Sequence, residues 1–361
     1  MALIDKLTAI GDAIRRKTGK TELISLDDMP NEIDGIESGN NKLAEFADGT
    51  LVEINESDLK GATTIHTYAF LRSPALTYVS APSDVKSIGS YAFSGCYSLT
   101  TVNFPSCTSV GDMAFTSCSS LTSVSLPACT TITASTFHAC RSLESVNFPA
   151  CTNIGLYAFR SCSSLTTADF PVCTWISGEA FNNCSSLVSV NFPNCSYIGY
   201  SAFANCISLS MANFPTCTTI AGSAFMSCTA LNSVSFPVCT SIGVSAFIGC
   251  QSLTSVNFPS CSEVGSSAFR NCTSLNTAVF SVLRSIASSA FYGCSSLMSF
   301  VNYYSSVASL ARNTVFYNTP IYTSSLTGSF GSIYVPASLV DAYKSATNWT
   351  AFADQIVGIP E

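Results

Sequence analysis

Residues 252–272 read SLTSVNFPSCSEVGSSAFRNC, and variants of this text follow one another along most of the chain. The repeat length is 22 residues, and phenylalanine and leucine mark it most clearly. The phenylalanines are Phe93, Phe115, Phe137, Phe159, Phe181, Phe203, Phe225, Phe247, Phe269 and Phe291. The leucines are Leu99, Leu121, Leu143, Leu165, Leu187, Leu209, Leu231, Leu253, Leu275 and Leu297. A degenerate coil with Phe70 and Leu76 precedes them. Such a fixed period is the signature of a repeat protein.

Within one coil, alternating side chains predict a short strand. Val256 and Phe258 are two residues apart and should point inward, while Ser255 and Asn257 point outward. The proline at 259 cannot donate to a strand ladder and stands where the strand should end. The glycine at 265 suits a tight bend of the backbone. A single coil has no second layer over its apolar side, so only stacking of coils can stabilise it.

The repeated text fits the leucine-rich-repeat frame L-x-x-L-x-L-x-x-N/C. The fuller pattern A-F-x-x-C-x-S-L-x-x-V-x-F-P-x-C-x-x-I-G resembles the BspA-type (Treponema pallidum-type) leucine-rich repeats of bacterial surface and phage-associated proteins, over roughly residues 61–320. This resemblance implies a right-handed parallel β-solenoid with little helix in the array and helical caps at both ends. It also implies an adhesion or interaction protein, because most members of the family are described in that way.

The chain divides by composition into four segments. Residues 1–40 carry an amphipathic helical pattern and resemble a leader segment of prophage and phage-tail-like proteins; a helical cap or an oligomerisation handle is the alternative. Residues 41–60 read as a hairpin around Asp48-Gly49. Residues 61–325 form the repeat array. Residues 326–361 read as a C-terminal cap, with a last strand at 332–336 and a helix at 337–346.

Charge and hydropathy exclude several classes of partner. Residues 61–300 hold 6 acidic and 6 basic residues, so the array is neutral and offers no electrostatic footprint for nucleic acid. No apolar run approaches the ~18 residues of a membrane-spanning helix. Charges at Asp5 and Lys6 interrupt the apolar core that a signal peptide needs, so we expect none in this chain. Its compartment therefore stays open, with a bacterial cell surface or a virion favoured by the resemblance.

All 18 cysteines lie in the array, and from Cys96 to Cys272 one occurs every 11 residues. Two columns along the solenoid are therefore expected. The spacing contains no C-x-x-C, and the chain has 2 histidines, so a zinc or iron–sulfur site is not expected. Neighbours in a column would lie ~4.8 Å apart, within disulfide range, but with parallel Cβ vectors. Buried thiols are the favoured interpretation, with a disulfide ladder as the alternative.

No catalytic arrangement emerges from the sequence. His66 and His138 lie in different coils, and the many serines have no base beside them in the sequence. No nucleotide-binding or metal-hydrolase motif occurs, so we expect neither enzymatic activity nor a cofactor.

The outward residues of the strands remain as the candidate binding surface. They form a neutral ribbon of Asn and Ser, suited to a carbohydrate or to a polar protein surface. The alternative is that these short side chains only solvate the strands and cross-link them. Bulky departures from the repeat cluster between the fourth and sixth coils. The candidate partner-binding residues are Asn147, Asp169, Asn191, Asn213, Trp175, Tyr197, Tyr200 and Met211. The predicted function is a non-enzymatic interaction or adhesion module; the alternative is a passive spacer whose flanks mediate assembly.

Overall fold

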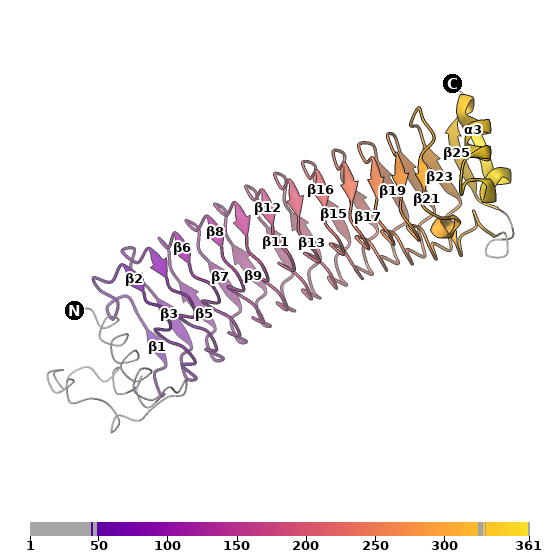
Figure 1. The fold of residues 1–361 in the computed structure, drawn as a ribbon. Coiled ribbons are helices and arrows are strands. Elements are labelled where there is room, and N and C mark those ends of the chain that lie inside the picture. Colours follow the sequence, from indigo (N-terminus) through magenta and orange to yellow (C-terminus); the bar gives the residue numbers. More distant parts are fainter. Residues whose placement is uncertain (1–44, 46–48, 324–327, 329, 360–361) are drawn as a thin grey trace, which may run out of the picture. The chain divides into compact units, whose positions relative to one another are not determined.

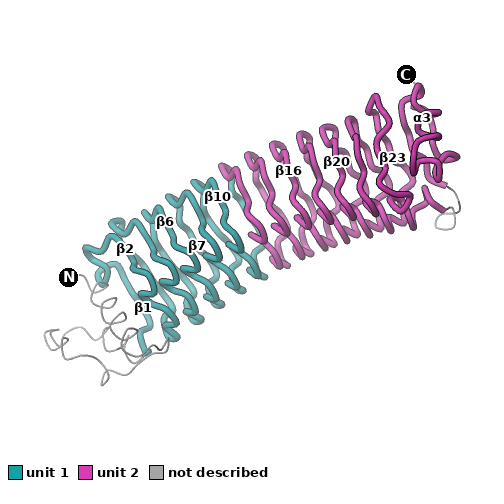
Figure 2. Tube along the Cα trace, viewed as in Figure 1, with its two compact units in different colours: residues 1–170 teal, residues 171–361 magenta. Residues whose placement is uncertain are grey.

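The computed structural model describes residues 45, 49–323, 328 and 330–359, and these fall into two compact units, residues 1–170 and 171–361 (Figure 2). In each unit, successive coils stack through short parallel strands (Figure 1). The predicted parallel β-solenoid with little helix is confirmed in both. Each coil contributes two strands instead of the single one expected from the sequence. Most odd-numbered strands form one face of a unit, the odd face, and the even-numbered strands β2 to β24 form another, the even face.

The first unit shows this arrangement in its simplest form. Its odd face consists of β1 (Glu53–Ile54), β3 (Tyr78–Ser80), β5 (Thr101–Asn103), β7 (Ser123–Ser125), β9 (Ser145–Asn147) and β11 (Thr167–Asp169). Its even face consists of β2 (Thr64–Ile65), β4 (Ser87–Ile88), β6 (Ser109–Val110), β8 (Thr131–Ile132) and β10 (Asn153–Ile154). Paired strands are parallel and equivalent residues lie side by side, as Val102 and Val124 do.

The second unit continues the same pattern and ends on a different element. Its even face consists of β12 (Trp175–Ile176), β14 (Tyr197–Ile198), β16 (Thr219–Ile220), β18 (Ser241–Ile242), β20 (Glu263–Val264), β22 (Ser285–Ile286) and β24 (Ser309–Leu310). Its odd face consists of β13 (Ser189–Asn191), β15 (Met211–Asn213), β17 (Ser233–Ser235), β19 (Ser255–Phe258), β21 (Thr277–Phe280), β23 (Ser299–Asn302) and β25 (Ser332–Pro336), with β26 (Ile356–Ile359) pairing in parallel to β25.

The C-terminal cap differs in part from its prediction. The strand at 332–336 is found as predicted, but the helix after it is short. It divides into η5 (Ala337–Leu339) and α3 (Val340–Ser345), and η6 (Thr350–Gln355) then leads to β26. Strand β25 is therefore not the last, because β26 adds a further strand beside it. One more short helix, η3 (Asn313–Phe316), lies in the final coil.

The cap closes the interior of the last coil. The indole of Trp349 is 1% exposed, and its Nε1 donates to the carbonyl oxygen of Ala308 at 2.7 Å. The hydroxyl of Tyr343 accepts the backbone N–H of Ala308 at 3.0 Å. The ring of Phe352 meets that of Phe316 edge to face, at 5.4 Å between centroids. The cap thus covers an apolar end and satisfies backbone groups that a further coil would otherwise satisfy.

At the other end, strand β1 pairs in parallel with β3 and begins the odd face of the first unit. The other arm of the hairpin predicted at 41–60 includes residues 46–48, which lie outside the described residues. The helical segment predicted at 1–40 also lies outside them.

The interior is built from columns of stacked phenylalanine rings. In the second unit, Phe203, Phe225, Phe247 and Phe269 stack one above another, with centroids 5.3, 5.2 and 5.3 Å apart. A second column, which includes Phe214, meets the first edge to face. All these rings are completely buried, and each contributes about 1.5–3 kcal/mol through burial.

Two residues in each coil adopt the left-handed backbone conformation, and most are not glycine. They flank the repeated phenylalanine, as Ser223 (φ 56°) and Ser227 (φ 58°) flank Phe225. The conformation costs roughly 1–2 kcal/mol for an L-residue. Here it directs the two N–H groups to the next coil, where they donate to Val244 and Ile248, each at 2.8 Å. These bonds offset the strain, because they link the coils where no strand does.

The glycine column that includes Gly265 has another physical reason than the bend expected from the sequence. A Cβ on Gly243 would lie 2.6 Å from the carbonyl carbon of Ala221, and one on Gly265 would lie 2.6 Å from that of Gly243. Neither residue has a positive φ. The glycines therefore allow the backbones of successive coils to approach closely beside the even face.

The cysteines form the two predicted columns, and all 18 are buried. In the column that includes Cys228, the thiol donates to the phenylalanine carbonyl of the preceding coil, here Phe203 at 3.1 Å. In the column that includes Cys239, it donates to the carbonyl two residues later, here Ser241 at 3.2 Å. The favoured interpretation of buried thiols agrees with this structure, since these thiols satisfy backbone carbonyls inside the coil.

Candidate functional site

The ribbon of Asn and Ser predicted as a binding surface lies on the odd face. Asn147 on β9, Asp169 on β11, and Asn191 and Asn213 on β13 and β15 are all exposed. Some of these polar groups bond to the neighbouring coil. The Nδ2 of Asn147 donates to the Oγ of Ser125 at 2.9 Å, and Asn103 bonds in the same way to Ser80 at 3.3 Å. In these coils the ribbon therefore cross-links strands, as the alternative interpretation proposed.

Hydroxyl groups form a second kind of cross-link just before the even strands. Thr218 donates to the carbonyl of Ser196 at 3.2 Å, and Thr240 donates to that of Thr218 at 3.2 Å. Ser262 continues the ladder with the carbonyl of Thr240 at 3.3 Å. Much of the Ser and Thr content thus joins one coil to the next, which is a structural use of these residues.

An aromatic pair interrupts the small polar residues of the even face. Trp175 on β12 and Tyr197 on β14 are register partners, and their rings stack with centroids 4.0 Å apart and an interplanar angle of 17°. Trp175 is 44% exposed. The residues that follow in the same outward column are Thr219 and Ser241, which are much smaller. The pair is therefore an aromatic platform, exposed at Trp175 and half-buried at Tyr197, next to a stretch of hydroxyl side chains.

The other two bulky candidates lie elsewhere. Tyr200 is 60% exposed in the turn after β14. Met211 is 57% exposed but stands on β15, which belongs to the odd face. The structure therefore brings Trp175 and Tyr197 into contact, and it places Met211 with Asn191 and Asn213 on a different face.

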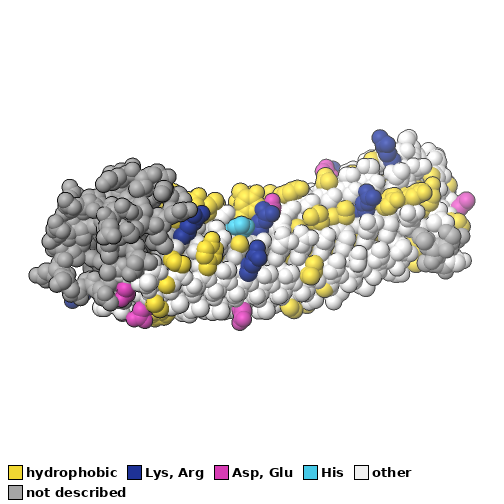
Figure 3. All heavy atoms as spheres, turned by 90° about the horizontal axis from the view of Figure 1, so that it is seen from below, with side chains coloured by type: hydrophobic (Ala, Val, Ile, Leu, Met, Phe, Trp, Pro, Cys, Tyr) yellow, Lys and Arg dark blue, Asp and Glu magenta, His cyan; other side chains and the backbone are white. Residues whose placement is uncertain are grey.

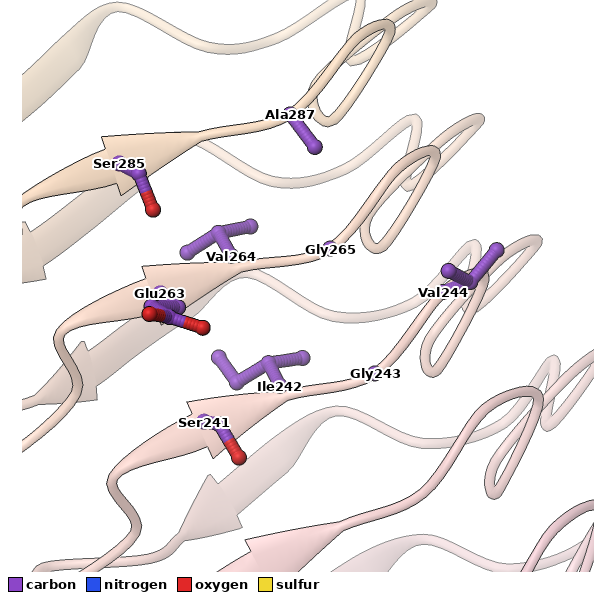
Figure 4. Close-up of a pocket in the computed structure, with 9 residues that line it drawn as sticks. All are labelled: Ser241, Ile242, Gly243, Val244, Glu263, Val264, Gly265, Ser285 and Ala287. Atoms are coloured by element: carbon purple, nitrogen blue, oxygen red, sulfur yellow. The ribbon is translucent and has the colours of Figure 1, made fainter. Parts of the chain in front are cut away.

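A shallow hollow of about 320 Å³ opens on the even face at β18, β20 and β22 (Figure 4). Its lining residues are Ser241, Ile242, Gly243, Val244, Glu263, Val264, Gly265, Ser285 and Ala287. Gly243, Gly265 and Ala287 line the hollow with little or no side chain, beside the exposed Val244. This hollow was not predicted from the sequence, where its only sign is a single carboxylate, Glu263, in a column of mostly Ser and Thr.

The carboxylate of Glu263 has no ion-pair partner within residues 45, 49–323, 328 and 330–359. The guanidinium of Arg284, one coil later, lies over the ring of Tyr304 at 5.3 Å from its centroid. The guanidinium of Arg270 similarly lies over Tyr292, at 4.7 Å. Figure 3 shows a face on which few side chains are charged and most of the surface is uncharged. An exposed carboxylate in such neutral surroundings can accept hydrogen bonds from a ligand.

Comparison with known proteins identifies the repeats. The family described as "BspA type Leucine rich repeat region" matches residues 63–172, 152–276 and 218–337. The chain belongs to the BspA-type leucine-rich-repeat family. No curated protein matches it.

Several solved structures resemble this BspA-type chain. A leucine-rich cell surface protein from Faecalibacterium prausnitzii is 25% identical, with a TM-score of 0.38 over 68% of this chain and 83% of that one. A leucine-rich repeat protein from Bacteroides ovatus is 19% identical, with a TM-score of 0.45 over 86% of this chain and 92% of that one. The T. pallidum leucine-rich repeat protein is 26% identical, with a TM-score of 0.32 over 56% and 78%.

The chemistry of the BspA-type array is that of a scaffold. Burial raises the pKa of the Cys228 and Cys217 thiols to about 12, so almost no reactive thiolate is present near neutral pH. Burial, and then the positive charge of Arg160, lowers the pKa of His138. Among the described residues no cluster of His, Cys, Asp and Glu could hold a metal ion, and no helix there is long and apolar enough to cross a membrane. Leucine-rich-repeat solenoids are typically non-enzymatic interaction scaffolds, and nothing in the described part of the chain indicates catalysis.

Proposed function

We propose that this chain is a non-enzymatic interaction module of the adhesion type, which binds a protein or a glycan through the even face of residues 171–361. The observation that carries the proposal is the stacked pair of the exposed Trp175 and the half-buried Tyr197. Large aromatic side chains are enriched among the residues that dominate binding energy. Placed on a face of Ser and Thr, this pair has no role in the interior of the coil.

We further propose that the module acts on a bacterial surface or on a phage-like particle. Two features support this location: the family of the repeats, and the resemblance of residues 1–40 to a leader segment of prophage and phage-tail-like proteins. Residues 1–40 are the segment that would join the module to its assembly. The neutral array would then meet its partner without electrostatic steering, so binding should depend weakly on salt.

The second candidate is a passive spacer, and the odd face favours it. There Asn147 and Ser125 bond to each other, and the outward columns vary little from coil to coil. In that case the array sets a length, and the flanking segments make the contacts.

One experiment separates the two functions. The full chain is immobilised and exposed to extracts of bacterial surface protein and to a glycan array, next to a variant with Trp175, Tyr197 and Tyr200 all replaced by Ser. The matched control replaces Met211, Asn191 and Asn213 on the odd face by Ser. We expect the even-face variant to remain folded and to lose at least tenfold in affinity, while the control retains it.

The spacer receives support from the opposite result. If the even-face variant binds as the unchanged protein does, and a chain without residues 1–40 does not, the flank and not the array carries recognition.

A further inference from the structure

One line of outward residues on the even face combines the aromatic pair with hydroxyl groups and a carboxylate. Tyr197, Thr219, Ser241 and Glu263 are successive register partners on β14, β16, β18 and β20. Parallel strands lie ~4.8 Å apart, so the line from Tyr197 to Glu263 is roughly 14 Å long. It holds an aromatic ring at one end, a carboxylate at the other, and two hydroxyl side chains between them.

Tyr197 is half-buried, and its two neighbours along this column differ in size. Trp175 covers one face of its ring at 4.0 Å between centroids. On the side of Glu263 the register partner is Thr219, whose side chain is too short to cover a ring. The electron-rich face of an aromatic ring attracts C–H groups, and one face of a pyranose ring presents a row of them.

The opposite end of the line suits the hydroxyl groups of a sugar. Glu263 stands at the hollow of about 320 Å³, beside Gly243 and Gly265. This volume lies at the small end of the range for ligand sites. A carboxylate can accept two or more O–H groups at once, and hydrogen bonds to a charged acceptor are stronger than neutral ones.

We propose that the line from Tyr197 to Glu263 binds a short, uncharged glycan. One pyranose stacks on Tyr197, and hydroxyl groups of a further sugar bond to Glu263. This inference rests on the proposed binding function of the even face and names its ligand. The glycan is uncharged because Glu263 would repel an acidic sugar, and the nearby cation of Arg284 is held over Tyr304. A protein partner fits less well, because the line lacks the deep apolar pocket in which protein hot spots are buried.

The chain carries its own reporter for this site. Its tryptophans are Trp175, which is 44% exposed, and Trp349, which is 1% exposed. A ligand stacked on Tyr197 changes the surroundings of Trp175 only. Neutral and acidic oligosaccharides on a glycan array identify binders, and titration of the full chain with a binding neutral oligosaccharide, followed by tryptophan fluorescence, then gives affinity.

The test uses Tyr197→Ser and Glu263→Gln, with Tyr97→Ser and Glu144→Gln as exposed controls in the first unit. We expect neutral oligosaccharides to bind and acidic ones to fail. Tyr197→Ser should abolish the fluorescence response to the sugar, and Glu263→Gln should weaken binding about tenfold. Both controls should bind as the unchanged protein does. Circular dichroism confirms that each variant is folded.

Two results overturn the inference. The first is an array on which no neutral glycan binds. The second is binding that is unchanged by both Tyr197→Ser and Glu263→Gln. If, in either case, a captured protein partner is lost with the even-face triple variant, the proposed interaction function stands and only the glycan assignment falls.

Discussion

The odd and even faces of the second unit are built on the same coils, yet they present different surfaces. On the odd face, the outward columns of β13, β15, β17 and β19 hold Ser and Asn, with Met211 as the bulky exception among them. On the even face, the outward column runs from Trp175 and Tyr197 through Thr and Ser to Glu263. The inward residues beneath both are the same few types, Phe, Leu, Ile, Val, Ala and Cys.

This difference shows at which positions of a coil a repeat protein can gain ligand-binding residues. An inward position is fixed by packing, because a changed volume disturbs the coils on either side. An outward position is fixed only where its side chain cross-links the coils, as Thr218 does with Ser196. Binding residues can therefore appear at outward positions without loss of the fold. Three experiments test whether a change in the protein destabilises both faces or only one of them.

The largest effect should come from alkali, which acts on the interior shared by both faces. Burial raises the pKa of the Cys96 and Cys228 thiols to about 12, from an ordinary value of 9.0. Between these values the folded chain keeps thiol protons that the unfolded chain releases. Stability is therefore complete below about pH 9 and falls as the pH rises towards 12. Each such thiol removes up to about 1.4 kcal/mol per pH unit.

With 18 buried cysteines, we expect cooperative unfolding before pH 12, seen as a loss of circular dichroism. Cys261→Ala should be less stable at pH 7 but less sensitive to alkali, because one titrating group is gone. Retention of the native spectrum throughout this range would contradict the account of the interior.

The second effect concerns the end of the array. Deletion of residues 330–361 exposes Phe316 and removes the partners of Ala308. We expect both faces to lose order near the last coils and the protein to aggregate, as measured by size-exclusion chromatography with light scattering. The milder Trp349→Phe keeps the apolar ring and removes the indole N–H, and should cost about 1–3 kcal/mol in urea unfolding. A soluble monomer of unchanged stability after the deletion would show that residues 330–361 are not a cap.

The smallest effect should be confined to the even face. Gly243→Ala places a Cβ 2.6 Å from the carbonyl carbon of Ala221, so the coils must separate there. We expect a loss of about 1–3 kcal/mol in urea unfolding. Ala221→Gly is the matched control in the preceding coil, and it should cost less because nothing is forced apart. Equal stability of the two variants would mean that the close approach of coils at this column has no energetic weight.

Much of the fold was predictable because it depends on period alone. The 22-residue recurrence of Phe and Leu predicts stacked coils, and the alternation of Val256 and Phe258 predicts the odd strands with their inward side. The even strands were missed, since two residues such as Ser241–Ile242 are too short for alternation to be recognised. The left-handed residues were missed too, because Glu179, Tyr157 and Met113 occupy positions where glycine would have signalled them.

For the candidate site, the sequence by itself determined which residues are unusual. Trp175, Tyr197, Tyr200 and Met211 depart from their columns, and a comparison of successive coils finds them. Only the tertiary structure decided which of them act together. Within each coil the chain turns between its odd and its even strand. Trp175 and Tyr197 therefore meet on β12 and β14, while Met211 lies on the odd face. The alignment of Glu263 with Tyr197, 66 residues earlier by number, follows from the period, because stacking aligns every twenty-second residue. That this column forms an outward face with a hollow at Glu263 was decided by the tertiary structure. The period is a property of the amino-acid sequence, whereas the odd and even faces arise from where the backbone turns.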